Sequence, residues 1–185
     1  MEPRTVVLVE GPSDRGAVEA LARRRGRDLV AEGVAVVSIG GSKNIGRAVQ
    51  AYGPSGRGLA LAGLCDVGEE RDFREGLERA GLGADLSRED MERLGFFVCV
   101  QDLEDELIRA LGVAAVEGVI EAEGELGTFR TFQRQPAWND RREDEQLRRF
   151  FGTYRGRKIR SAPLLVEALD LARVPRPLDR LLSYV

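Results

Sequence analysis

The 185-residue chain contains no histidine, and this absence excludes several kinds of chemistry. Neither a Ser-His-Asp triad nor a Cys-His pair can form, and no zinc ion can be bound through imidazole groups. The two cysteines, Cys65 and Cys99, are too few for a cysteine-rich metal site, and both lie inside apolar runs. We expect both thiols to be buried hydrophobic groups, because no nearby residue would activate them as nucleophiles.

Long apolar runs and lysines are also scarce. No apolar run approaches the about 20 residues that a membrane-spanning helix needs, and no secretory signal is recognisable, so we expect a cytoplasmic protein. Lys43 and Lys158 are the only lysines, and every other basic side chain is arginine. The net charge of −3 argues against a protein that coats nucleic acid, although arginines cluster after residue 140.

Short apolar runs alternate with amphipathic segments along the first 112 residues. Residues 5–10, 34–39, 59–65 and 96–101 are apolar runs that predict buried parallel strands. The segments between them predict helices, the first capped by Ser13 or Asp14 and a short one capped by Ser87. This alternation is typical of βαβ units, so the fold class is α/β, with a mainly parallel four-stranded sheet flanked by helices.

The strand pattern ends near residue 112. Four later segments are helical or loop-like in pattern, and they are residues 113–123, 126–132, 144–151 and 161–172. With 43% hydrophobic and 32% charged residues, the chain can bury a core and remain soluble. We therefore expect a catalytic core at residues 1–112 and a C-terminal helical extension at 113–185 that packs on the core.

Acidic residues stand where three of the predicted strands end. Glu10 closes the first strand, Asp66 follows the third, and Asp102 and Glu104 follow the fourth; Asp14 lies four residues after Glu10. Because the carboxyl ends of parallel strands meet at one edge of a sheet, we expect these side chains to converge. A helix cap would explain Asp14 and helix-dipole stabilisation would explain the acids after residue 101, but neither explains a glutamate at the end of a buried strand.

Clustered carboxylates without histidine or thiolate ligands favour Mg²⁺ or Mn²⁺, most often as a pair of ions that serve phosphoryl chemistry. A nearby lysine, Lys43 or Lys158, could stabilise developing negative charge. The Gly40–Lys43 turn resembles a phosphate-binding loop, but the Gly-Lys-Ser/Thr element is absent, so we do not predict nucleotide hydrolysis. Spacing alone does not settle which of the acids between residues 102 and 106 faces the metal.

Several of these motifs together resemble a TOPRIM domain of the type found in OLD (overcoming lysogenization defect) nucleases. They are Val-Leu-Val-Glu-Gly-Pro-Ser-Asp at 7–14, Gly-Gly-Ser-Lys-Asn-Ile at 40–45, the strand-terminal Asp66, and Asp-Leu-Glu-Asp-Glu-Leu at 102–107. The resemblance implies a compact Rossmann-like sheet with a metal site at its edge. It covers about residues 5–112, and more loosely the segment around Lys158.

The resemblance also implies roles for individual residues. The metal ligands that it implies are Glu10, Asp14, Asp66, Asp102 and Glu104, and the catalytic residues are Glu10, Asp66 and Lys158. Gly68 stands where the Asp-x-Asp motif has its second aspartate, and Glu69 or Glu70 could substitute for it. OLD proteins carry an ATPase domain before the TOPRIM domain, whereas this chain begins with the TOPRIM strand, so we expect the chain to act alone or with a separate ATPase or helicase.

Three functions remain open from the sequence. The first is a metal-dependent endonuclease acting on DNA, with Lys43, Arg155, Arg157 and Arg160 as the residues expected to contact the nucleic acid. The second is a catalytically degenerate TOPRIM-like module that binds nucleic acid or protein. The third is a metal-dependent phosphotransferase or phosphatase with a small phosphorylated substrate. A homodimer is compatible with each of them.

Overall fold

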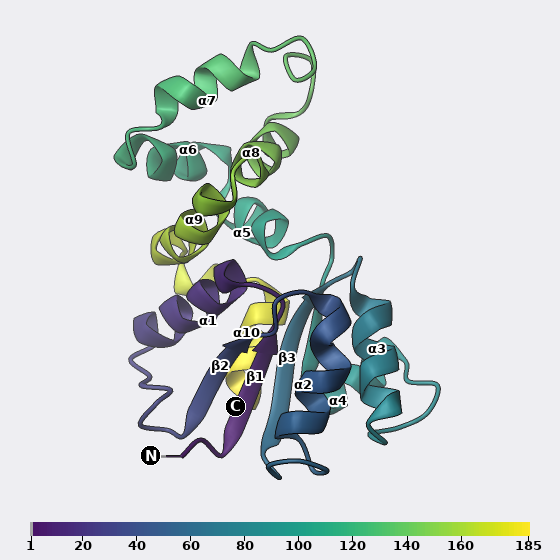
Figure 1. The fold of residues 1–185 in the computed structure, drawn as a ribbon. Helices are drawn as coiled ribbons and strands as arrows, with labels where there is room; N and C mark the ends of the chain where they lie inside the picture. The colour runs from purple at the N-terminus through teal and green to yellow at the C-terminus, as the bar shows by residue number, and fades with distance from the viewer. Residues whose placement is uncertain (1) are drawn as a thin grey trace.

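A four-stranded parallel sheet forms the centre of the protein, whose computed structural model describes residues 2–185 apart from the side chain of Arg155. Its strands are β1 (Thr5–Val9), β2 (Val34–Ser38), β3 (Ala60–Asp66) and β4 (Phe96–Cys99), and their order is β2-β1-β3-β4 (Figure 1). The four predicted strands are confirmed, with ends shifted by at most two residues. In register, Val9 lies beside Ser38 and Leu64, and Asp66 lies beside Cys99.

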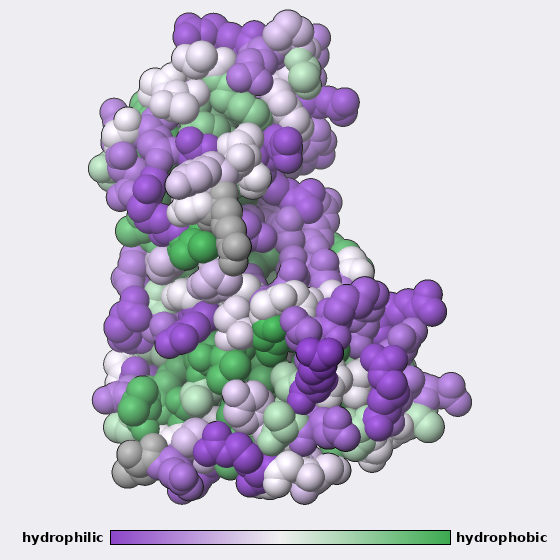
Figure 2. Space-filling model, viewed as in Figure 1, coloured by the Kyte–Doolittle hydropathy of each residue, from purple (hydrophilic) through white to green (hydrophobic). Residues whose placement is uncertain are grey.

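Helices cover both faces of the sheet, as predicted. One face carries α1 (Pro12–Arg24) and α10 (Arg176–Tyr184), and the other carries α2 (Ile45–Tyr52), α3 (Glu70–Arg79) and α4 (Arg88–Arg93). Alternate residues of β1 serve the two sides: Val7 and Val9 pack towards α1, whereas Val6 and Leu8 pack towards α2 and α3. Figure 2 shows apolar atoms gathered over the strands between α1 and α2, where the apolar core between the sheet and α2 reaches the surface.

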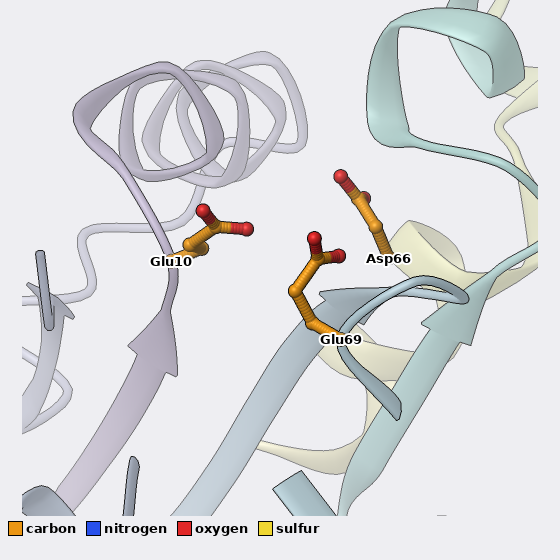
Figure 3. Close-up of side chains that lie close together, drawn as sticks. All are labelled: Glu10, Asp66 and Glu69. Atoms are coloured by element: carbon orange, nitrogen blue, oxygen red, sulfur yellow. The ribbon is translucent and has the colours of Figure 1, made fainter. Parts of the chain in front are cut away.

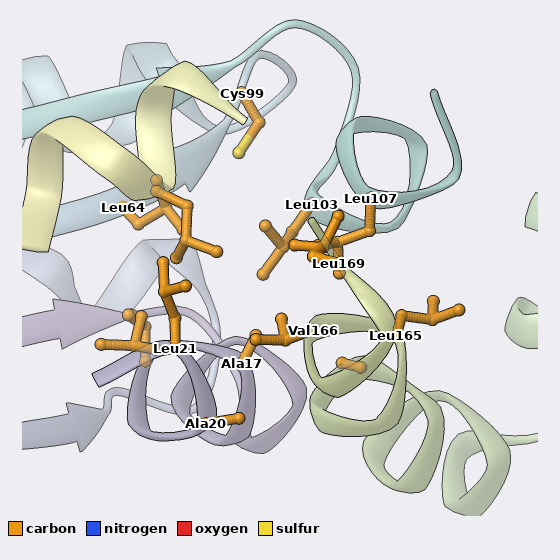
Figure 4. Close-up of a cluster of buried hydrophobic side chains, with 14 of the residues drawn as sticks. Ala17, Ala20, Leu21, Leu64, Cys99, Leu103, Leu107, Leu165, Val166 and Leu169 are labelled. Atoms are coloured by element: carbon orange, nitrogen blue, oxygen red, sulfur yellow. The ribbon is translucent and has the colours of Figure 1, made fainter. Parts of the chain in front are cut away.

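The remaining helices form a lobe beyond the carboxyl edge of the sheet (Figure 1). They are α5 (Leu103–Leu111), α6 (Val113–Ala122), α7 (Leu126–Gln133), α8 (Glu143–Gly152) and α9 (Arg155–Ala168). Helix α9 crosses α1, where Ala17 and Ala20 allow the two backbones to come close to each other, and Val166 fills the contact (Figure 4). This contact holds α9, which carries Lys158 towards the sheet edge. No helix of the described residues is both long and apolar enough to cross a membrane.

Two local predictions were wrong. Helix α1 is capped by Gly11 rather than by Ser13 or Asp14, and the Asp14 carboxylate at the third helical position accepts a hydrogen bond from the Gly11 amide at 2.8 Å. Helix α9 begins at Arg155 instead of residue 161, because Pro163 lies in its interior and does not mark its first turn. Its buried apolar face offsets the one backbone hydrogen bond that a proline loses.

Helix α10 is an addition to the elements expected from the sequence. Its leucines Leu178, Leu181 and Leu182 are buried against the sheet. The Arg27 guanidinium donates to the carbonyl of Val185 at 2.7 Å and so holds the end of the chain in place. Cys65 and Cys99 are buried and unpaired as expected, and burial raises the pKa of both thiols, which keeps them unreactive.

Candidate metal centre

Three carboxylates face one another at the carboxyl edge of the sheet. Glu10 follows β1, Asp66 ends β3, and Glu69 lies in the turn that leads to α3 (Figure 3). One oxygen atom from each of the three lies within 4.8 Å of the others. Strands β1 and β3 are direct neighbours in the sheet, which brings the first two residues together. The turn places the third, because the Glu69 amide donates to the Asp66 carbonyl at 3.0 Å.

A second acidic group lies beside this cluster, with one lysine. Glu104, in the first turn of α5, is only 3% exposed, and its Oε2 lies 3.0 Å from the Nζ of Lys158 on α9. Its other oxygen, Oε1, is buried without a hydrogen-bond partner among the described residues, and so is Oε2 of Glu69. A buried carboxylate oxygen without a donor is costly, so both atoms fit a position beside a cation.

Contacts within the chain distinguish the acids between residues 102 and 106. Asp102 caps α5: its Oδ1 accepts from the Asp105 amide at 2.8 Å, and its Oδ2 accepts from Arg148 of α8 at 2.6 Å. The Oε1 of Glu106 accepts from the Val100 amide at 2.8 Å. Of these acids, Glu104 therefore has the buried oxygen that is free to bind a ligand.

Burial and mutual repulsion make the cluster reluctant to ionise. Burial, followed by the charges of Asp14 and Asp102, raises the pKa of Asp66 from 3.8 to about 8. Burial also raises the pKa of Glu104 to about 7, although Lys158 opposes the rise. The pKa values of Glu10 and Asp14 are raised as well, again mainly by burial. A divalent cation would relieve this repulsion, which is why the donor set fits Mg²⁺ or Mn²⁺.

Lys158 stays charged in this environment. Burial by itself lowers the pKa of its ammonium group, but the carboxylates of Glu104, Asp14 and Asp66 raise it more, and the net pKa lies above its ordinary value. Its Nζ is thus a permanent positive charge beside the acidic cluster.

Three other basic residues predicted to contact nucleic acid, Lys43, Arg157 and Arg160, are engaged in ion pairs. Lys43 lies 2.6 Å from Asp72, and Arg160 lies 2.8 Å from Glu123. Arg157 pairs with Glu125, and its guanidinium lies 3.9 Å from the centre of the Phe150 ring. These two arginines therefore hold α9 against the turn between α6 and α7. The side chain of Arg155 lies outside the described residues.

The acidic sheet edge and the parallel α/β architecture are the features that the resemblance to a TOPRIM domain implies. Residues 4–60 match the family described as "Overcoming lysogenization defect protein-like, TOPRIM domain". This match and the similarity of the chain to the C-terminal region of OLD proteins confirm the resemblance and the fold class. No curated protein sequence matches it.

Two solved structures are similar over nearly the whole chain. The C-terminal region of the OLD protein from Xanthomonas campestris pv. campestris is 25% identical, with a TM-score of 0.77, and the match covers 99% of this chain and 92% of that one. The C-terminal region of the Burkholderia pseudomallei OLD protein is 24% identical, with a TM-score of 0.72, covering 100% and 97%. The helical lobe thus shares the overall fold of these proteins together with the sheet.

Of the three clustered carboxylates, Glu69 is the one that the sequence indicates only as a possible replacement for the missing second aspartate. Gly68 has no side chain to offer, and Glu69, one residue later, takes a place beside Glu10 and Asp66. The acidic pair after Gly68 was the signal for this residue. The sequence contains no corresponding signal for the bond from Arg148 to Asp102, which joins residues 46 positions apart.

Proposed function

We propose that this protein is a divalent-metal-dependent nuclease that cleaves phosphodiester bonds in DNA. The observation that carries the proposal is the convergence of Glu10, Asp66 and Glu69, whose oxygens lie within 4.8 Å of one another at the edge of a TOPRIM-type sheet. Buried carboxylate oxygens without partners, on Glu69 and Glu104, support it.

Two groups of ligands are available for Mg²⁺ or Mn²⁺. The first consists of Glu10, Asp66 and Glu69, and the second of Asp14 and Glu104, with Asp102 beside them. When bound, the ions would polarise the phosphodiester, neutralise its charge and lower the pKa of water at the site. The carboxylates contribute by holding this arrangement before the substrate arrives, since Glu10 and Asp66 come from the ends of rigid strands and Glu104 comes from the first turn of α5.

Lys158 has a separate role in the proposal. Its ammonium group is anchored 3.0 Å from Glu104 and keeps its proton at neutral pH. A fixed positive charge at this position would stabilise the negative charge that develops on the phosphate and the leaving oxygen during cleavage. Glu104 orients the lysine, because an ammonium group on a flexible side chain would otherwise sample many positions.

The test is cleavage of supercoiled plasmid in Mg²⁺ and in Mn²⁺, with and without EDTA. We expect nicked or linear product from the wild-type protein, and none with EDTA or with Asp66→Asn. Asp85→Asn is the matched control: Asp85 is exposed, away from the sheet edge, and has a φ of 52°, a conformation that asparagine tolerates. This control should cleave like the wild type.

Two other outcomes would replace the proposal. A protein that binds Mn²⁺ in calorimetry and hydrolyses a small phosphoester, with no cleavage of plasmid, would be a phosphatase or phosphotransferase. A folded protein that binds oligonucleotides without metal binding or turnover would be a degenerate binding module. Cleavage that persists in EDTA would also contradict the metal-dependent mechanism.

A further inference from the structure

A groove of about 890 Å³ runs between the start of α5 and helix α8, next to the acidic sheet edge. We call it the arginine groove, because five arginines line it: Arg109, Arg141, Arg142, Arg148 and Arg149. Val100, Gln101 and Asp102 line the end at which β4 passes into α5. Because Asp66 and Cys99 are neighbours in the sheet, this end of the groove begins beside the metal centre.

The lining of the arginine groove contains more arginines than acidic residues. Three of the arginines are neutralised by neighbouring acids, since Arg148 pairs with Asp102, Arg109 with Asp105 and Arg142 with Asp144. The other two arginines, Arg141 and Arg149, are exposed and form no ion pair among the described residues. One acid of the lining, Glu145, is likewise without an ion pair. The lining residues therefore carry one more positive than negative charge, on a chain of net charge −3, and the two arginines without ion pairs are the groups available to a ligand.

The loop that carries Arg141 is held rigidly by a buried side chain. Gln146 of α8 is 4% exposed, and its Nε2 donates to the carbonyls of Trp138 at 2.7 Å and Arg141 at 3.0 Å. Its Oε1 accepts from Gln133 at 2.7 Å. A buried amide with all of these bonds satisfied fixes the backbone of the loop, so the groove exists before any ligand binds.

We propose that the arginine groove binds the sugar–phosphate backbone of the nucleic acid and leads it to the metal centre. The proposal rests on the proposed function and adds the path of the substrate. It places the phosphate contacts on Arg141 and Arg149, whereas the predicted residues Arg157 and Arg160 use their charges within α9 and its neighbours. Exposed guanidinium groups without ion pairs are the groups that can release counterions from a phosphate backbone.

Trp138 makes the groove directly observable. It is the only tryptophan in the chain, it lines the groove, and its ring stacks on Phe132 with 5.3 Å between the ring centres. A strand in the groove would change the surroundings of this single indole. We therefore expect its fluorescence to change as an oligonucleotide is added in EDTA, where no cleavage occurs.

The experiment measures the binding of fluorescein-labelled oligonucleotides of about 20 nucleotides, single-stranded and duplex, by fluorescence anisotropy. The titrations are carried out in EDTA over a range of salt concentrations. We expect Arg141→Gln/Arg149→Gln to weaken binding about 10-fold near 0.1 M salt and to reduce the slope of log affinity against log salt by about 2. Arg57→Gln/Arg180→Gln removes two exposed arginines outside the groove and should bind like the wild type.

The outcomes separate this proposal from the proposed function. If the wild type binds the oligonucleotides without a change in Trp138 fluorescence, or if the Arg141/Arg149 variant keeps the affinity and salt slope of the wild type, the groove is not the path of the nucleic acid. Cleavage of plasmid in that case would leave the nuclease proposal intact. Binding in the groove without cleavage by the wild type would support the groove and overturn the nuclease. No binding to either oligonucleotide would overturn the groove.

Discussion

Replacing Asp66 with asparagine should make the metal-free protein more stable at alkaline pH. The folded protein keeps this carboxyl protonated up to about pH 8, whereas the unfolded chain loses the proton near pH 3.8. Between these values the folded state binds more protons, so the contribution of Asp66 to stability falls as pH rises. The difference in pKa corresponds to about 4 kcal/mol between pH 5 and pH 8, and partial exposure of the side chain lowers the expectation to about 2 kcal/mol.

The assay is urea unfolding of the wild type and of Asp66→Asn at pH 5 and pH 8, each in EDTA and in Mn²⁺. In EDTA the variant should be the more stable protein at pH 8, by about 2 kcal/mol, and the difference should shrink at pH 5. In Mn²⁺ the order should reverse, because only the wild type gains the free energy of metal binding. Asp85→Asn should follow the wild type under all four conditions.

A variant that is equally or less stable than the wild type at pH 8 in EDTA would refute the reasoning. The structure shows no hydrogen bond to the Asp66 side chain among the described residues, so an amide at this position removes repulsion without removing a bond. Loss of stability would therefore mean that the carboxyls do not repel one another as described. An unchanged response to Mn²⁺ would mean that Asp66 is not a ligand.

Three further results are expected. Lys158→Met leaves the buried carboxylate of Glu104 without its cation. In EDTA, the free energy of unfolding should fall by about 3 kcal/mol at pH 8 and by less at pH 5, where Glu104 is protonated. An equal loss of stability at both pH values would contradict the ion pair. Gly76→Ala places a Cβ 2.7 Å from the Cγ2 of Ile45, so it should reduce the free energy of unfolding by about 2 kcal/mol and lower the melting temperature. Gly118→Ala adds a Cβ in open space on α6 and should not lower the melting temperature. The rise in melting temperature caused by Mn²⁺ should be larger at pH 8 than at pH 6, because the carboxyls with raised pKa must lose protons to bind a cation. A rise that does not depend on pH would contradict those pKa values.

The sheet was predictable because its strands are buried on both faces. Such strands are continuous apolar runs, and each of the four runs in the first 101 residues became a strand. The parallel arrangement then implied that acids at the strand ends would converge, and Glu10 and Asp66 lie in the same cluster. The division of the chain at residue 112 stays a prediction, as do the roles of the individual site residues.

Helix boundaries after residue 150 were less predictable, for a physical reason. Pro163 is equally compatible with the first turn of a helix and with a helix interior whose apolar face is buried. Only the contact of α9 with α1 distinguishes the two, and that contact joins segments about 145 residues apart. Helix α10 escaped prediction in the same way, because its short apolar pattern becomes a stable helix only against the sheet.

Local residue pattern was sufficient for the strands and for the acidic edge, because these depend on apolar periodicity and on the position of the acids at the ends of the strands. The arrangement of distant segments settled the rest. Two basic residues of the helical lobe distinguish Glu104 from Asp102, because Lys158 pairs with Glu104 and Arg148 pairs with Asp102. The arginine groove likewise exists because α8 lies beside α5, and no spacing along the chain expresses the distance between two packed helices.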